Sequence, residues 1–482
     1  MIALARYGAA AACVVTVFLL AAAMGALLRH EDGAAAFLAT ALLTVFGAGA
    51  VYLGLRNVKA QLGRLSSFAL LLVLWLGIPA IAAFPIYATT PFTFAQSWFE
   101  AILTFTTTGG GAIHDVDALP RATLGWLLTL QWTGGLLTLV GFVAVLGPAG
   151  VGGLPDHAER SHLLRRSGAT SLSDALRQVL PFYFGATVVC TVMLYAVGLR
   201  VFDALGLAGA ALSTGSVLPD ADGMAAYGHF AVKLVMMLFM LVGGTSILWH
   251  RMLLTRRFRL ALGQQENLGV VLASLVIGIL AAAGWYATPI GHQSLPLALE
   301  DGLFTGIALV TTTAIEPHAG AFAVLPLVLV LVVVFVGGAS FSSAGGIKMY
   351  RAAAMAVQSS LELERLVHPN AVHPRRLGQQ SITMQMMKAI WLCFGVACCV
   401  VVMLTAAIAP AMPSFESALV AIVAAISNAG PIYSAGWTEG VVWPDWIALP
   451  TYAQLILAIA MILGRLEILV VVGLAHFAFW RR

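Results

Sequence analysis

The sequence predicts an all-α polytopic membrane protein, and three observations lead to this prediction. Hydrophobic residues make up 60% of the 482 residues and charged residues only 10%, whereas soluble domains carry about 25% charged residues. Apolar stretches of about 20 residues, the length of a membrane-crossing helix, recur along the chain. The repeated alternation of a β-barrel is absent, and a backbone in lipid must satisfy its own hydrogen bonds. The spans should therefore be helices.

Two plain spans open the chain. Residues 9–28 and 35–55 are joined by an acidic turn, and Arg6 gives the first span the basic flank of a signal peptide. A second apolar segment follows at once and no convincing cleavage site is evident. We therefore expect a retained accessory two-helix hairpin over residues 1–60.

From Ser66 onward one unit recurs four times: an outgoing helix, a shorter apolar segment, a polar loop and a returning helix. The shorter segments are too short and too polar to span, so we expect re-entrant half-helices. The four pore repeats are expected at residues 61–155, 156–262, 263–366 and 367–482. The expected outgoing helices are 66–87, 176–198, 268–288 and 384–409; the half-helices 92–105, 201–212, 297–310 and 415–426; and the returning helices 122–147, 228–254, one from about 321, and 450–479.

The four polar loops are alike, and they are spaced almost evenly. We call them loop 1 (Thr106–Gly110), loop 2 (Ser213–Ser216), loop 3 (Thr311–Ala314) and loop 4 (Ser427–Gly430). Backbone carbonyls from four such loops around an axis can replace the hydration shell of an ion. Half-helices whose C-terminal ends point inward would favour a cation there. One loop alone is equally typical of a small-residue helix contact, but the fourfold recurrence favours a pore.

The third returning helix is interrupted by residues 337–346, which we call the Ser/Gly segment. So many Gly and Ser residues make a poor membrane helix, and irregular backbone survives at membrane depth only under a cover of protein or water. We expect this segment to lie across the inner half of the pore; the alternative is a close-packed helix of small residues.

Arg465 lies in an apolar stretch, where a charge is expensive unless it faces a partner or a wet cavity. It would face the conduction path as part of a gate, or form a buried ion pair with an acid such as Glu467.

The charges alternate along the chain. Basic loops should be cytoplasmic by the positive-inside rule, which places both termini inside and the four loops at the outer face. The basic residues are Arg6, Arg56, Lys59, Arg64, Arg160, Arg165, Arg166, Arg177, Arg251, Arg256, Arg257, Arg259, Lys348, Arg351, Arg365, Arg375, Arg376, Lys388, Arg481 and Arg482; the intervening acids are Glu31, Asp32, Asp115, Asp117, Asp220, Asp222, Glu316, Glu439 and Asp445.

Enzyme chemistry finds no support in the sequence. It contains neither an H-E-x-x-H metal motif nor a G-x-x-x-x-G-K-[ST] phosphate loop, and its histidines are scattered. We expect no enzyme activity, no cofactor and no nucleic-acid partner. The basic run from Arg251 to Arg259 suggests contact with lipid or a nucleotide. However, most such basic runs serve to set the orientation of the neighbouring helices in the membrane. Membrane lipid is an expected partner.

Four strings resemble the Trk/Ktr/HKT superfamily of potassium transporters, most closely its bacterial TrkH type: Trp98–Gly109, Leu130–Gly135, Ser343–Lys348 and Gly464–Glu467. The resemblance covers essentially the whole chain. It implies four non-identical pore units, a homodimer in the bacterial cytoplasmic (inner) membrane, and a cytoplasmic nucleotide-binding regulatory ring of the TrkA kind. It implies a K⁺ selectivity filter at Thr107, Thr108, Gly109, Ser213, Thr214, Gly215, Thr312, Thr313, Ala314, Asn428, Ala429 and Gly430, and a gate at Ser342, Ser343, Gly345, Gly346 and Arg465.

Two loops depart from the family pattern. Family filters usually carry Gly in every loop, but loop 3 has Ala314, which tolerates a positive φ poorly. In loop 2, Ser216 stands where a second Gly is common. We expect gated K⁺ uptake, with Na⁺ or Rb⁺ permeation left open. The alternative is a proton- or sodium-coupled K⁺ symporter, which needs a titratable carboxylate in the pathway. Glu100, the acid directly beside a loop, is the candidate for this carboxylate. Its alternative role is structural: it would anchor the half-helix by hydrogen bonds to neighbouring backbone.

Overall fold

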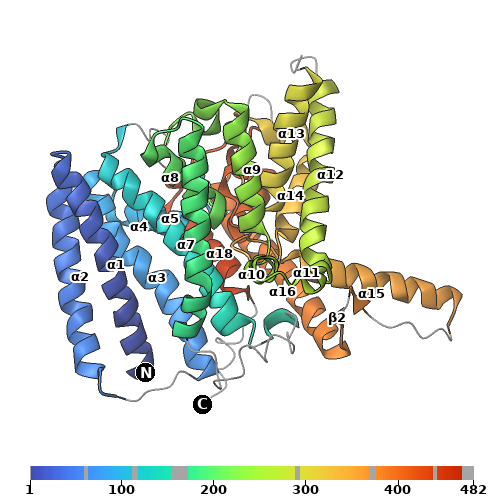
Figure 1. Cartoon of the computed structure of the whole chain (residues 1–482), viewed down its shortest axis with the longest axis horizontal. Coiled ribbons are helices and arrows are strands. Elements are labelled where there is room, and N and C mark those ends of the chain that lie inside the picture. Colours follow the sequence, from blue (N-terminus) through green and yellow to red (C-terminus); the bar gives the residue numbers. More distant parts are fainter. Residues whose placement is uncertain are drawn as a thin grey trace.

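The described chain is built almost entirely of helices (Figure 1). The computed structural model describes residues 2–58, 63–110, 118–148, 150–153, 172–287, 294–369, 376–378, 380–437 and 442–468. Among these residues, seven helices are long and apolar enough to cross a membrane, or eight if a bent pair counts as one span. The predicted class, an all-α polytopic membrane protein, is confirmed. Several residues of the predicted basic loops lie outside the described residues: Lys59, Arg160, Arg165, Arg166, Arg375, Arg481 and Arg482.

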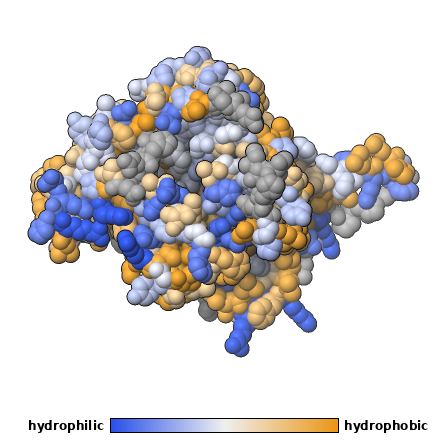
Figure 2. Space-filling view, turned by 90° about the horizontal axis from the view of Figure 1, so that it is seen from above, coloured by the Kyte–Doolittle hydropathy of each residue, from blue (hydrophilic) through white to orange (hydrophobic). Residues whose placement is uncertain are grey.

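The N-terminal hairpin lies at one side of the molecule (Figure 1). It consists of α1 (Ile2–Leu28) and α2 (Ala34–Leu55), and α1 packs against α3 and α5. The far face of α2 is apolar and exposed, with Leu43 at 74% and Phe46 at 80%. In a view from above, hydrophobic residues also gather along the rim of the molecule (Figure 2). Such a surface suits lipid and not water.

Each outgoing helix is followed by a shorter helix close to the expected range. The outgoing helices are α3 (Arg64–Thr89), α7 (Leu172–Ala196), α12 (Gln265–Ala287) and α16 (Met384–Ile408); the shorter helices are α4 (Phe94–Phe105), α8 (Val201–Ser213), α13 (Leu295–Val310) and α17 (Phe415–Ile426). Capping boxes begin two of the shorter helices: Thr93 pairs with Gln96 before α4, and Ser414 with Ser417 before α17. Such a cap satisfies N–H groups that a helix start leaves free.

The returning helices are α5 (Arg121–Gly141), which continues as a π-helical turn (Phe142–Leu146), the pair α9 (Phe230–Gly244) and α10 (Ile247–Leu254), α14 (Leu327–Val336) and α18 (Thr451–Leu466). The expectation of a single helix over 228–254 is wrong, because the structure has two helices there, α9 and α10, which meet at 106°. The backbone N–H of Ser246 donates to Asn267 Oδ1 (2.8 Å), and that of Ile247 to the Phe341 carbonyl (3.0 Å). These contacts replace the helical ladder at the bend. The expected fourth returning helix extends past residue 468, beyond the described residues.

Several smaller elements were not expected from the sequence. Helix α15 (Met349–Val367) projects sideways from the helical body (Figure 1). Helix α11 (Phe258–Leu262) follows α10, and β1 (Arg376–Leu377) pairs antiparallel with β2 (Gln380–Ser381). Short 3₁₀ turns occur at Val151–Gly153, Gly223–Tyr227, Ala321–Val324, Ala409–Ala411, Gly430–Ser434 and Trp446–Ala448.

Half-helices and returning helices pack alternately in a closed series. Along it, α4 contacts α5, α5 contacts α8, α8 contacts α9, α9 contacts α13, α13 contacts α14, α14 contacts α17, α17 contacts α18, and α18 contacts α4 again. The C-terminal ends of the four half-helices carry loops 1 to 4. The packing therefore brings together loops that lie far apart in the sequence.

Candidate functional site: four loops and an interrupted helix

The four half-helices end in the same backbone turn. The residue that ends the turn has a left-handed conformation in every loop: φ is 55° at Thr107, 52° at Thr214, 55° at Thr312 and 51° at Asn428. In loops 1, 2 and 4 the next residue then donates its N–H to the carbonyl five residues earlier, at 2.9–3.0 Å. Left-handed backbone is rare for non-glycine residues. Four repetitions at equivalent places therefore mark one shared local structure.

The loops contact one another through Thr108. Its carbonyl accepts from Gly430 N (2.8 Å) in loop 4 and from Ser216 Oγ (3.3 Å) in loop 2. Its hydroxyl accepts from Asn428 Nδ2 (3.0 Å). The structure thus joins predicted residues of loops 1 and 4 directly, whereas loop 2 reaches Thr108 through Ser216, which was not among the predicted site residues. The polar loop side chains with at most 1% exposure are Thr106, Thr107, Thr108, Ser213, Thr214, Thr311, Thr312, Thr313, Ser427 and Asn428.

Ala314 adopts the conformation that its side chain disfavours. Its φ is 51°, close to the 62° of Gly109. The two residues are equivalent in position, because Gly109 lies two residues after the left-handed Thr107 and Ala314 lies two residues after the left-handed Thr312. By the same count Ser216, two residues after Thr214, is the loop 2 counterpart of Gly109. The sequence had aligned Gly215 with Gly109 and left Ser216 out of the predicted site. The left-handed φ at Thr214, which sequence cannot display, sets this register.

Glycines of the returning helices let the loops approach closely. A Cβ on Gly134 of α5 would lie 1.7 Å from the Phe105 carbonyl oxygen, and one on Gly464 of α18 would lie 2.1 Å from that of Ile426. Either substitution would push a helix away from the loop it supports. The side chain of Gln131 also holds loop 2, because its Oε1 accepts from Val217 N (2.8 Å) and its Nε2 donates to Val217 O (3.1 Å).

Arg465 joins loop 1 to the Ser/Gly segment. Its Nε donates to the Thr106 carbonyl (2.6 Å), its Nη1 to the Ser343 carbonyl (2.5 Å) and its Nη2 to Thr107 Oγ1. The residue is 2% exposed. The alternative, an ion pair with Glu467, differs from the structure, in which Glu467 pairs with Arg351.

The Ser/Gly segment is not helical and lies beneath the loops. Ser343 Oγ donates to the Leu212 carbonyl (2.7 Å) and the Gly243 carbonyl (2.9 Å), which lie at the ends of α8 and α9. Gly345 N donates to Thr312 Oγ1 (2.7 Å) of loop 3, and a Cβ on Gly345 would lie 1.8 Å from the Ser427 carbonyl of loop 4. Gly346 has a φ of 77°. The segment therefore contacts parts of the second, third and fourth units at once.

Buried charges surround the segment. Lys348 and Arg351, expected in a basic cytoplasmic loop, are each 2% exposed. Lys348 Nζ donates to the Ala344 carbonyl and lies 4.7 Å from the Phe142 ring centroid. Arg351 Nη2 forms an ion pair with Glu467 Oε2 (2.5 Å). Glu266 of α12 accepts from the backbone N–H groups of Ser340, within the segment, and of Tyr350, in the first turn of α15 (3.2 Å for Tyr350), so it joins the segment to α15.

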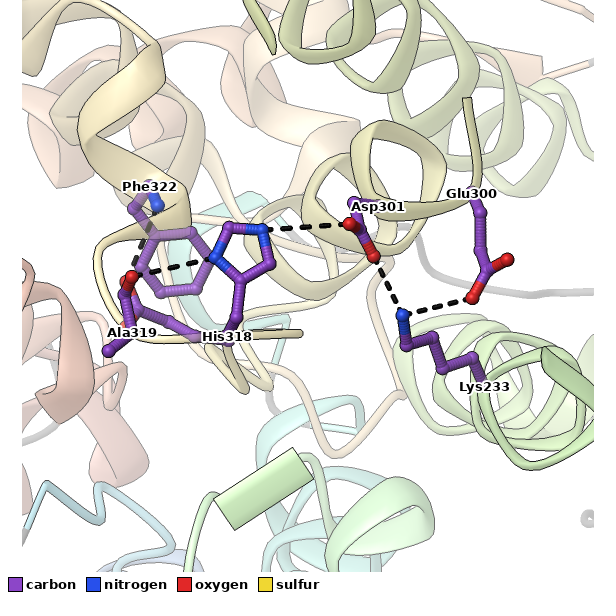
Figure 3. A network of polar contacts seen from close by, with 7 residues as sticks. Lys233, Glu300, Asp301, His318, Ala319 and Phe322 are labelled. Carbon is purple, nitrogen blue, oxygen red and sulfur yellow. Dashed lines mark hydrogen bonds and ion pairs between the residues drawn. The ribbon is translucent and has the colours of Figure 1, made fainter. Parts of the chain in front are cut away.

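A second charged network joins α9, α13 and the connection that follows loop 3 (Figure 3). Lys233 of α9 pairs with Glu300 (2.9 Å) and Asp301 (2.8 Å) of α13. His318, in the connection after loop 3, lies 3.6 Å from Asp301 Oδ2. The sequence did not identify Lys233, although a lone lysine near the start of an apolar helix signals a buried partner.

A cavity of about 430 Å³ opens beside loops 1, 2 and 4. Gly110, Ser216 and Pro431 line it next to the loops, and Glu100, Asp220 and Asp445 bring carboxyl groups to it. Glu100 Oε1 also accepts from Thr104 Oγ1 (3.3 Å), so this carboxyl both contacts the half-helix and faces the cavity. An acidic cavity attracts cations.

Comparisons with known proteins show what the chain is similar to. A family model named TrkH and described as a cation transport protein matches residues 34–273 and 321–478. The Trk system potassium uptake protein TrkH of Escherichia coli K12 is 29% identical over 471 residues, which cover 94% of each chain. The protein of the same name from Vibrio parahaemolyticus is 26% identical over 486 residues and covers 97% of this chain and 96% of its own.

A solved structure supports the fold independently. The crystal structure of the potassium transporter TrkH from Vibrio parahaemolyticus matches with a TM-score of 0.85 and 24% identity, covering 100% of this chain and 99% of that one. The family model covers most of this chain, which confirms the expectation of a transport protein and not an enzyme: the chain belongs to the TrkH family of cation transport proteins.

Proposed function

We propose that this protein carries K⁺ into the cell by passive, gated movement through one pore lined by loops 1 to 4. The observation that carries the proposal is the left-handed residue that recurs at the ends of four half-helices, which pack with the returning helices in a closed series. Helix C-terminal ends carry partial negative charge, and loop carbonyls can replace the water around a cation. The relatives named above as potassium uptake proteins make K⁺ the expected ion.

The gate of this pathway would be the Ser/Gly segment together with Arg465. A guanidinium directly beneath loop 1 raises the electrostatic barrier to a cation, and its hydrogen bond to Ser343 holds the segment in place. Opening would require this bond and the contacts of Gly345 to break. The residues assigned to the gate are Ser342, Ser343, Gly345, Gly346 and Arg465.

Ion selection would depend on all four loops. The proposed filter residues are Thr107, Thr108, Gly109, Ser213, Thr214, Gly215, Thr312, Thr313, Ala314, Asn428, Ala429 and Gly430. Ala314 in loop 3 and Ser216 in loop 2 stand where a filter of this family usually carries Gly. These two side chains could weaken the preference for K⁺ over Na⁺, so Na⁺ is the competing ion to test.

The membrane orientation and the partners follow from the family and from the charge pattern. We place both termini in the cytoplasm and loops 1 to 4 toward the outside of the bacterial inner membrane, because the basic residues gather in alternate connections. A homodimer and a nucleotide-binding regulatory ring of the TrkA kind are part of this proposal. Light scattering of the purified protein, alone and with its ring, tests both assemblies.

The second candidate function is symport of K⁺ with H⁺ or Na⁺. It is favoured by Glu100, whose buried carboxyl faces the cavity beside loop 1. The test is ⁸⁶Rb⁺ uptake into proteoliposomes loaded with K⁺, measured with and without gradients of pH and Na⁺. Uptake that needs neither gradient supports the passive pathway, whereas uptake that appears only with one of them supports symport. In that case Glu100→Gln should abolish the gradient-dependent uptake.

A further inference from the structure

A groove lies between α7 and α10, away from the four loops. It has a volume of about 400 Å³. Polar groups of Arg177, Gln178 and Arg251 line it, and the rest of its wall is apolar: Val143, Val179, Pro181, Phe182, Ile247, Leu248 and Leu254. The groove thus combines two guanidinium groups with a hydrophobic wall.

The bend between α9 and α10 creates this groove. Because α10 leaves α9 at 106°, it runs across the end of the helical body instead of continuing the span. Arg251 Nη1 donates to Gln178 Oε1 (3.1 Å), which joins α10 to α7 at the groove. Beyond the groove the surface is apolar and exposed, with Phe184 at 57%, Leu254 at 72% and Phe258 at 55%. These side chains suit the acyl region of a bilayer.

Positive charge dominates the polar edge of the groove. Among the described lining residues none is acidic. Arg256, Arg257 and Arg259 follow directly on the connection to α11 and on α11 itself, and all three are exposed. Asp174, one turn before Arg177 on α7, offsets only part of this charge. The edge therefore matches an anionic headgroup, and the apolar wall matches the chain attached to it.

We propose that this groove binds an anionic phospholipid of the cytoplasmic leaflet. The phosphate would lie between Arg177 and Arg251, and an acyl chain would lie along Phe182, Leu248 and Leu254. Guanidinium groups bind phosphate with paired, charge-assisted hydrogen bonds, whereas a zwitterionic headgroup carries its own compensating cation. The position of the site in the cytoplasmic leaflet rests on the orientation given under the proposed function.

The groove is connected to the Ser/Gly segment. Ile247, in its wall, donates its backbone N–H to the Phe341 carbonyl of that segment (3.0 Å). Phe182, in the opposite wall, stacks on His250 of α10 at 5.3 Å between ring centroids. A lipid that fixes α10 against α7 would therefore also fix Ile247 and, through its hydrogen bond, the backbone of the segment at Phe341. Occupancy of the groove should favour the closed arrangement of the segment.

The test measures lipid retention and does not depend on transport. Full-length protein is delipidated, reconstituted with equal phosphatidylglycerol and phosphatidylcholine, and analysed by native mass spectrometry. We expect wild-type protein to retain phosphatidylglycerol with a preference on the order of ten- to thirtyfold, since each arginine near a membrane surface favours an anionic lipid by about tenfold or less. The double variant Arg177→Gln/Arg251→Gln should lose this preference. A matched variant, Arg56→Gln/Arg365→Gln, removes two exposed arginines elsewhere and should keep it.

Three results would overturn the proposal. Equal retention by the groove variant and the wild type would exclude the two arginines as the headgroup site. Displacement of the lipid by millimolar inorganic phosphate would indicate a site for a soluble anion. Unchanged lipid retention with weakened capture of the regulatory ring would indicate a protein-docking surface. If the double variant does not fold, Leu248→Trp, which fills the apolar part of the groove, should displace the retained lipid in its place.

Discussion

Arg351 and Glu467 form a buried ion pair that joins the beginning of α15 to the residue directly after α18. Their Nη2 and Oε2 atoms are 2.5 Å apart, and their side chains are 2% and 5% exposed. Glu467 has a φ of 62°, so the chain turns where α18 ends and directs this carboxylate to α15. The pair holds the start of α15, which directly follows Lys348, to the end of α18, which carries Arg465; both of these basic side chains donate to carbonyls of the Ser/Gly segment.

Loss of one partner of this pair should destabilise the protein strongly. Glu467→Gln leaves the Arg351 charge buried without its counter-ion, which typically costs about 3–5 kcal/mol. Thermal unfolding in detergent measures the change. The double variant Arg351→Met/Glu467→Leu should recover much of the loss, because it removes both charges. The control is Glu362→Gln, which breaks the exposed pair with Arg365 (2.9 Å, side chains 47% and 50% exposed); it should cost about 1 kcal/mol or less.

Replacing Arg465 with Ala should increase basal ion flux. The change removes a fixed charge beneath loop 1 and the hydrogen bond to the Ser343 carbonyl. Flux is measured as ⁸⁶Rb⁺ uptake without any regulatory partner. Arg465→Lys keeps the charge but cannot reproduce the three hydrogen bonds that the planar guanidinium group donates to Thr106, Thr107 and Ser343. Its flux should therefore lie between those of the wild type and the Ala variant. Flux at or below the wild-type level in folded Arg465→Ala protein would argue against a gating role.

Replacing Ala314 with Gly should stabilise loop 3 and sharpen the choice of K⁺ over Na⁺. Ala314 has a φ of 51°, and glycine adopts that conformation without the steric cost of a Cβ, a gain of about 1 kcal/mol. Ala429→Gly serves as the control for the stability measurement alone, since Ala429 has a φ of −133° and its replacement by Gly should lower stability. The readouts are thermal unfolding and the K⁺/Na⁺ permeability ratio. If the ratio does not change, loop 3 contributes little to selectivity.

Glu316 should give the protein a pH-dependent stability. It lies in the connection after loop 3, where burial raises the pKa of its carboxyl from 4.5 to about 7, against the backbone hydrogen bonds from Gly320 and Phe322. The folded state therefore favours the neutral acid. The stability that Glu316 contributes is complete below pH 4.5 and is lost as the pH rises to about 7, a change of about 3 kcal/mol.

The measurement is the melting temperature of wild type and Glu316→Gln between pH 4.5 and 8. The wild type should lose stability relative to the variant as the pH rises. His318, whose pKa is raised chiefly by Asp301 and also by Glu316, titrates in both proteins, so the difference between the curves reports Glu316 together with its interaction with His318. Parallel curves would refute the assignment.

Much of the fold follows from local signals in the sequence. The ends of the half-helices were predictable because Thr93 and Ser414 cap two of them and because Thr and Gly residues follow the apolar stretches. The bend after Gly244 was not, since the apolar pattern continues through it and the cause is a distant acceptor, Asn267. Local pattern cannot reveal a contact made 21 residues away.

The candidate site was predictable in composition but not in register or pairing. The repeated Thr, Ser and Asn residues identified the four loops, yet only the backbone conformation of Thr214 aligns Ser216 with Gly109. Arg465 was identified from its charge alone. Its contact with Thr106, 359 residues earlier, and the pairing of Glu467 with Arg351 depend on how the units pack.

The central claim is that loops 1 to 4 surround a single cation path. Crystals of the purified protein grown in Rb⁺ test it most directly, because anomalous scattering locates this K⁺ substitute. We expect Rb⁺ density between the loops, coordinated by carbonyl oxygens around Thr107, Thr214, Thr312 and Asn428. Rb⁺ bound elsewhere, with the space between the loops empty in protein that transports Rb⁺, would contradict it.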